Sequence, residues 1–238
     1  MPRKEPEFSP EPGVLTVYSE IACPWASLAL HGLRRARHRL GLTRVRIDLR
    51  AFPQELLDGG PTPKRVLDAE IPVIGGLDET LGWRMWQGPD DRWPASTLLA
   101  QEAVQAAKRP DVGGLAASDE LDAALRRAMF ADSRCIALLT EILAVAEDCP
   151  KVNTKALTKA LYLGSGRAEV IMQWRTAKDR AVHGSPHVFL PDGSEWHNPG
   201  VEVRWTGGDR GAGFPIVLSY DPTVYDEIVT AALHASPV

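Results

Sequence analysis

A single cysteine, Cys23, occurs in the tetrapeptide Cys-Pro-Trp-Ala, at a point where the apolar stretch 14–18 gives way to helical spacing over residues 27–40. The first stretch is typical of a buried strand and the second of an amphipathic helix. Cys23 is therefore predicted to cap a helix whose first residue is Pro24. Unpaired helix amides stabilise a thiolate at such a position, so we expect an exposed, ionised and nucleophilic sulfur.

The tetrapeptide lacks a second thiol, because Ala26 stands where a C-x-x-C redox pair has its other cysteine. If Cys23 forms a mixed disulfide, the thiol that resolves it comes either from outside or from Cys135 or Cys149. An external small thiol is the simpler assumption. The alternative interpretation is that Cys23 is an inert, half-buried residue, since cysteine is often buried.

Two segments resemble a known family. Residues 19–25, Ser-Glu-Ile-Ala-Cys-Pro-Trp, resemble the active-site segment of DsbA-like thioredoxin-fold proteins, in particular the FrnE-type group, with C-P-W-A in place of C-P-W-C. Residues 184–190 resemble the cis-proline loop of that family and the strand after it, with Pro186 as the proline. The resemblance implies that Trp25 is an exposed, variable residue of the motif and that substrate is bound by Ser185, Pro186 and His187.

The same resemblance implies an α/β fold. Its thioredoxin-like core, with a four-stranded mixed sheet, is expected from residues 13–52 and 183–238. Residues 53–182 would form an irregular segment and a large α-helical insertion, whose last helix packs on the core. Residues 1–12, rich in proline and glutamate, are expected to be a flexible tail.

Local patterns agree with this division. Alternation over residues 44–52 predicts a strand that completes a βαβ unit. Residues 187–190 and 194–197 flank a Pro-Asp-Gly turn and predict a hairpin. Residues 95–181 are mostly helical in character, and residues 221–233 predict a final amphipathic helix.

Two stretches contain many residues that break regular structure. Proline and glycine recur between residues 53 and 94, which predicts an irregular segment, and five glycines between residues 200 and 215 predict a surface loop. The first stretch also holds three of the seven tryptophans, which either wall a ligand groove or pack the insertion on the core: Trp83, Trp86 and Trp93.

For each of two further side chains near the motifs, the sequence leaves two roles possible. Glu20, three residues before Cys23, either relays the thiol proton from a partly buried position or is an exposed strand-end carboxylate. His187 either lies beside Cys23, where an imidazole pairs with a thiolate, or is turned away by the alternation of its strand.

Composition and sequence patterns argue against several classes of protein. With 44% hydrophobic residues and a net charge of −4, the 238-residue chain is expected to fold and not to bind nucleic acid. The basic run at residues 34–39 is expected to be a solvated helix face or to attract an anionic thiol. No apolar run is long enough to cross a bilayer and none follows residues 1–7 as a signal segment, so a cytoplasmic location is expected. The spacing of histidine and cysteine favours neither a metal site nor a disulfide framework.

The sequence therefore favours a DsbA-family monothiol thiol-disulfide oxidoreductase or thiol-dependent reductase with Cys23 as the nucleophile. Its partners would be a disulfide or electrophilic substrate and a glutathione- or mycothiol-type thiol, with no bound cofactor. One alternative is an enzyme similar to the kappa-class glutathione transferases or the 2-hydroxychromene-2-carboxylate isomerases, which uses a bound thiol. Another is a non-catalytic thioredoxin-fold binding protein. The oligomeric state stays open between monomer and homodimer.

Overall fold

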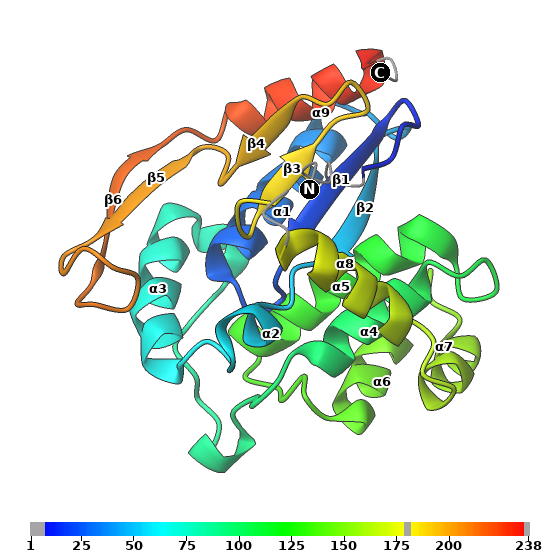
Figure 1. The fold of residues 1–238 in the computed structure, drawn as a ribbon, viewed down its shortest axis with the longest axis horizontal. Coiled ribbons are helices and arrows are strands. Elements are labelled where there is room, and N and C mark those ends of the chain that lie inside the picture. Colours follow the sequence, from blue (N-terminus) through cyan, green and yellow to red (C-terminus); the bar gives the residue numbers. More distant parts are fainter. Residues whose placement is uncertain (1–7, 179–181, 236–238) are drawn as a thin grey trace.

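In the computed structural model, which describes residues 8–178 and 182–235, four strands form the central sheet in the order β2-β1-β3-β4 (Figure 1). Strand β1 (Val14–Ser19) is parallel to β2 (Arg46–Ala51) and antiparallel to β3 (His187–Phe189), which in turn is antiparallel to β4 (Glu195–His197). The predicted four-stranded mixed sheet is confirmed.

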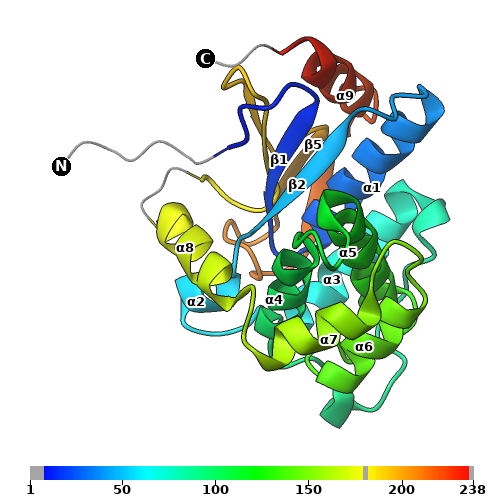
Figure 2. The same ribbon diagram turned by 90° about the vertical axis from the view of Figure 1, so that its right-hand side faces the viewer.

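Strand β1 is buried along its whole length because helices cover both faces of the sheet. Helix α1 (Pro24–Arg39) and helix α9 (Val224–His234) lie together on one side, where they pack against Leu15 and Val17 (Figure 2). The other face carries Tyr18, which packs with residues of α8 and β3. The predicted first and last helices are both present.

The insertion is helical, as predicted over its described part, residues 95–178. Five helices follow one another there: α4 (Leu98–Ala107), α5 (Gly114–Phe130), α6 (Leu139–Glu147), α7 (Thr154–Tyr162) and α8 (Arg167–Lys178). Helices α4, α5 and α8 contact β2. Of the predicted tail, residues 1–7 lie outside the described residues, and Phe8 stacks on Phe189 with ring centroids 5.9 Å apart.

The prediction of an irregular segment at residues 53–94 is wrong in part. The segment holds α2 (Gln54–Asp58), α3 (Lys64–Leu77) and the short 3-10 helices η1 (Glu79–Leu81) and η2 (Asp90–Arg92). Helix α3 forms although Pro72 lies inside it. Leu67, Ile71 and Ile74 are buried on one side of this helix, and their burial outweighs the local cost of the proline.

The prediction of a surface loop at residues 200–215 is also wrong in part, because residues 201–205 form a strand and only residues 206–214 connect it to the next one. Strands β5 (Val201–Trp205) and β6 (Pro215–Tyr220) form a separate two-stranded antiparallel sheet, here called the β5–β6 hairpin. The alternation of Val201, Val203 and Trp205 was the signal for a strand. Figure 1 shows the hairpin extending from the end of β4 along α3.

Candidate active site

Cys23 caps α1, as predicted, and Pro24 occupies the first turn. The backbone of Cys23 is extended, and its Sγ accepts a hydrogen bond from the Ala26 N–H at 3.4 Å. The Ser27 hydroxyl donates to the Cys23 carbonyl at 3.1 Å. The sulfur therefore lies within reach of an amide at the start of the helix.

The second motif meets the first. The thiol of Cys23 donates to the Ser185 carbonyl at 3.2 Å, and the Ser185 Oγ accepts from the Glu20 N–H at 2.8 Å. The Ser185–Pro186 peptide bond is cis, and Pro186 is buried. Residues separated by 162 positions in the chain thus form one site.

The expectation of an exposed, ionised sulfur is wrong for this structure. Cys23 is only 3% exposed, and this burial raises the pKa of its thiol. The Arg210 cation and the Ala26 N–H act in the opposite direction without outweighing burial. The sulfur is covered because it packs in a cluster with Trp25 and Ile74, against which the β5–β6 hairpin lies. At neutral pH this site holds a protonated thiol.

Trp25 is buried rather than exposed, which corrects a second expectation. Its Nε1–H donates to Oε1 of Glu70 on α3 at 2.8 Å. Arg210, at the tip of the β5–β6 hairpin, donates to both oxygens of the same carboxylate, from Nε at 2.9 Å and from Nη2 at 2.8 Å. Glu70 and Arg210 were missed because nothing in the sequence pairs residues 140 positions apart.

Glu20 is buried, so the alternative of an exposed carboxylate is wrong. Four groups donate to its two oxygens: the backbone N–H groups of Ala22 and Gln54, the Thr97 hydroxyl and the Gln101 amide. Burial raises the pKa of Glu20, and these hydrogen bonds oppose that rise. The carboxylate thereby fastens the turn that leads to Cys23.

His187 points away from the sulfur, so the interpretation that places its imidazole beside Cys23 is wrong. Its Nδ1 accepts from the His183 N–H at 3.1 Å, and its ring lies 4.2 Å from that of Phe189. Burial, with His197 and His183 nearby, lowers the pKa of His187 to about 4. His187 and Phe189 are two residues apart in β3 and therefore lie on the same face of the sheet, the face that carries Tyr18. Ser185 reaches the site from the loop before the strand.

Arg126, on α5 of the insertion, is a further residue that the sequence did not indicate. It is 3% exposed, and its Nη1 donates to the carbonyl oxygens of Glu20 and Ile21 at 3.0 and 3.2 Å. The same nitrogen donates to the Ser27 Oγ at 2.8 Å. Arg126 therefore holds both sides of the turn that carries Cys23.

The basic run at residues 34–39 is not a solvated face throughout. Arg34 donates to Asp119 and Asp122 on α5, and Arg37 donates to Asp119. These side chains join the first helix to the insertion. Carboxylates of the same chain therefore neutralise much of the positive charge of this run.

The three tryptophans of residues 53–94 contact other aromatic rings. Trp83 packs on Phe130 with centroids 4.7 Å apart, which favours the packing interpretation for that residue. Trp86 and Trp93 meet edge to face at 5.2 Å. Trp83 also packs against the cluster that contains Cys23, and Trp93 lines a small pocket together with Glu20 and Ala22.

The other two cysteines carry free thiols and lie in the helical insertion. Burial raises the pKa of Cys149 to about 11, and its thiol donates to the Val145 carbonyl at 3.4 Å. Cys149 packs in the main core cluster, whereas Cys23 belongs to the cluster beneath the β5–β6 hairpin. These contacts do not bring Cys149 beside Cys23.

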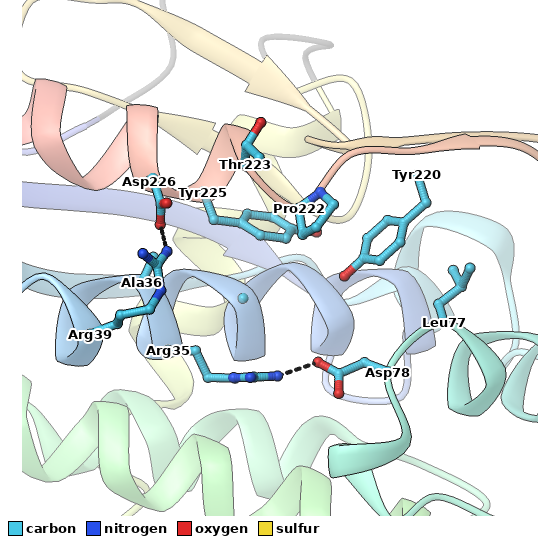
Figure 3. A pocket seen from close by; sticks show the side chains of 11 residues that line it. Arg35, Ala36, Arg39, Leu77, Asp78, Tyr220, Pro222, Thr223, Tyr225 and Asp226 are labelled. Carbon is cyan, nitrogen blue, oxygen red and sulfur yellow. Dashed lines mark hydrogen bonds and ion pairs between the residues drawn. The ribbon is translucent and has the colours of Figure 1, made fainter.

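A cavity of about 380 Å³ lies between α1, the end of α3 and the start of α9 (Figure 3). Arg35 points to Asp78 and Arg39 to Asp226, both in the lining of the same cavity. None of the predicted site residues lines it. Its positive charges are matched by carboxylates, and we place the candidate active site at Cys23 instead.

No cluster of histidine, cysteine or carboxylate residues suited to a metal ion occurs among residues 8–178 and 182–235. In the same described ranges, no helix has the length and apolar character needed to span a bilayer.

Comparison with known proteins identifies the fold. No protein-family model and no curated protein sequence matches the chain. Among solved structures, it is similar to a "probable DsbA oxidoreductase" from Streptomyces coelicolor, with a TM-score of 0.61, 18% identity and coverage of 94% of this chain and 92% of that one. The cytosolic disulfide reductase DsbM from Pseudomonas aeruginosa gives a TM-score of 0.61 at 16% identity, with coverage of 93% and 97%.

A 2-hydroxychromene-2-carboxylate isomerase is also similar, with a TM-score of 0.56 at 18% identity over 77% of this chain and 87% of that one. Likeness at these identities shows the fold alone. The chain has a DsbA-like thioredoxin fold with a helical insertion.

Proposed function

We propose that this protein, whose fold is DsbA-like, is a thiol-disulfide oxidoreductase that acts through one thiol. Cys23 is the nucleophile, and an external small thiol completes the cycle. The observation that carries the proposal is the position of the Cys23 sulfur, 3.4 Å from the Ala26 amide and 3.2 Å from the Ser185 carbonyl beside Pro186. The motif around Glu20 also supports kinship with the FrnE-type group.

The reaction consists of two exchanges. The Cys23 thiolate attacks one sulfur of a disulfide RSSR, forms Cys23–S–S–R and releases RS⁻. A second thiolate, R′S⁻, then attacks the R sulfur of that adduct, which gives RSSR′ and regenerates the Cys23 thiolate. The net change is RSSR + R′S⁻ → RSSR′ + RS⁻, so the chain needs no second cysteine at position 26.

Access to the sulfur requires movement, because Cys23 is buried in the resting structure. The covering elements are α3 and the β5–β6 hairpin, which are joined through Glu70 and Arg210. Their displacement would hydrate the sulfur and remove the cause of its raised pKa, while the Ala26 N–H still favours the thiolate. We propose that the reactive state is this opened one.

Ser185 and Pro186 form the substrate side of the proposed site, since the Ser185 backbone already bonds the thiol. A structure of the Pseudomonas aeruginosa DsbM with GSH supports a small thiol as the partner. A glutathione- or mycothiol-type thiol in the reducing cytoplasm fits a chain with a single motif cysteine. Glu20, Pro24 and Trp25 are proposed as positioning residues, and Ala26 as the residue that donates its amide.

A second candidate function is favoured by the burial and raised pKa of Cys23. In an enzyme similar to the glutathione transferases or the 2-hydroxychromene-2-carboxylate isomerases, a bound thiol would act as the nucleophile and Cys23 would only shape its site. The similarity to a solved isomerase supports this alternative.

Substitution of Cys23 separates the two functions. Exchange between hydroxyethyl disulfide and glutathione is measured for the wild-type chain, for Cys23→Ser and for the matched variant Cys135→Ser. Our proposal requires that Cys23→Ser reduce the catalysed rate to background while Cys135→Ser retains it. Full activity of Cys23→Ser would overturn the proposal and leave the bound-thiol function.

A further inference from the structure

A cavity of about 420 Å³ lies between α2, the start of α3 and the tip of the β5–β6 hairpin. Its lining residues include Gln54, Asp58, Thr62, Val66 and Arg210. Two of the lining residues are charged, and they have opposite signs: Asp58 and Arg210. The cavity thus offers a cation and an anion to one small ligand.

Arg210 keeps hydrogen-bonding capacity after its contacts within the protein are made. Its Nε and one N–H of Nη2 bind Glu70, and one N–H of Nη1 donates to the Gln54 Oε1 at 3.2 Å. A guanidinium has five N–H groups, so two have no partner within the described residues. The side chain is 33% exposed. A ligand carboxylate can therefore bind Arg210 without displacing Glu70.

The cavity is connected to the candidate active site through Arg210. Glu70 binds Arg210 on one side and the Trp25 indole on the other, and Trp25 is two residues from Cys23. Among the charged groups that act on Cys23, Arg210 has the largest influence and lowers the pKa of the thiol. A ligand held by Arg210 thus lies next to the elements that cover the sulfur.

We propose that this cavity binds the α-amino carboxylate end of the small thiol or disulfide that reacts with Cys23. Arg210 would bind the carboxylate, and Asp58 the ammonium group. This inference rests on the proposed function and narrows its partner to an amino-acid or peptide thiol of the γ-glutamyl type. A thiol whose cysteine is acetylated and amidated, as in mycothiol, offers neither charged group.

The binding test uses S-methylglutathione, which has no free thiol and therefore cannot react with Cys23. Calorimetry on the full chain should show binding of this probe, and binding about tenfold weaker for its diethyl ester or for Arg210→Met. Asp58→Asn should also weaken binding. Arg65→Met is the matched control, because Arg65 donates to the Gly211 carbonyl of the same hairpin tip but does not line the cavity. It should change the affinity by less than about twofold.

Equal affinity for the free acid and the ester in the wild-type chain would overturn the inference, and that comparison needs no variant to fold. Unchanged binding by a folded Arg210→Met would overturn it as well. The reaction of Cys23 with uncharged hydroxyethyl disulfide tests the proposed function separately. If Cys23 reacts with this disulfide but S-methylglutathione does not bind, the proposal that the cavity binds the ligand is refuted and the proposed function stands. If S-methylglutathione binds as expected but Cys23 does not react, the proposed function is refuted and the proposal for the cavity stands.

Discussion

The Trp25 indole donates a 2.8 Å hydrogen bond to Oε1 of Glu70, a carboxylate with no exposed surface. Because Arg210 binds the same carboxylate, one buried anion connects α1, α3 and the tip of the β5–β6 hairpin. A buried carboxylate is tolerated only when donors surround it, so the three side chains depend on one another. We expect this relationship to hold α3 and the β5–β6 hairpin in place over Cys23.

Glu70→Gln removes the anion while nearly conserving its shape. We expect the free energy of unfolding to fall by about 1–3 kcal/mol, since Arg210 loses a charged partner that is partly screened by solvent. Alkylation of Cys23 by iodoacetamide at fixed pH should accelerate, because α3 and the hairpin separate more often. Glu79→Gln, at an exposed position, is the matched control. A rate equal to that of the wild-type chain would show that Glu70 does not keep the site closed.

The pH dependence of Cys23 alkylation reports the pKa of its thiol. Burial raises that pKa, so the midpoint for the folded protein should lie above the value of about 8.5 for a free cysteine. Arg210→Met should move the midpoint upward again, because a positive charge that favours the thiolate is lost. Arg65→Met serves as the control for loss of an arginine near the tip. A wild-type midpoint below about 7 would contradict the burial of the sulfur.

Two glycines in helices should respond oppositely to the same substitution. A Cβ at Gly32 in α1 would lie 2.3 Å from the Tyr225 ring of α9, whereas a Cβ at Gly76 in α3 would meet nothing within 4 Å. Gly32→Ala should cost about 1–3 kcal/mol through forced separation of the two helices. Gly76→Ala should be neutral or stabilise by up to about 1 kcal/mol. Urea denaturation distinguishes them, and equal stability of both variants would refute the close contact.

His187 makes stability depend on pH in acid. An unfolded histidine binds a proton near pH 6.5, but the pKa of His187 is lowered to about 4 by burial. The half-exposed Glu195, 3.5 Å from its Nε2, is too well hydrated to compensate. Between these values the unfolded chain binds more protons, so stability present above pH 6.5 is lost as the pH falls towards 4.

We expect this loss to be about 1–3 kcal/mol and to shrink in His187→Asn, whose amide oxygen can still accept from His183. The comparison is made by urea denaturation at several pH values. His38→Asn, at an exposed position of α1, should keep the wild-type slope. A slope unchanged by His187→Asn would assign the acid sensitivity to other groups.

Local patterns and two short motifs were enough to predict the central sheet, the cap at Cys23 and the approach of Ser185 to it. Strand alternation and helix caps depend on residues close together in the chain, so they can be predicted from a single sequence. The cover over the sulfur was not predicted. Pro72 favoured an irregular structure in place of α3, and the glycines near Arg210 favoured a loop in place of the hairpin. Both elements form nevertheless, because tertiary packing outweighs these local preferences. The burial of Cys23 follows from these two elements, so its pKa was predicted in the wrong direction.

The most direct test of the account is the intact mass of the protein after exposure to a small disulfide. With hydroxyethyl disulfide we expect one mixed disulfide, mapped by peptide sequencing to Cys23, absent from Cys23→Ser and discharged when glutathione is added. Formation of this adduct should be faster in Glu70→Gln, whose cover opens more readily. If Cys23 stays unmodified in both proteins under conditions in which free cysteine reacts fully, Cys23 is not the nucleophile.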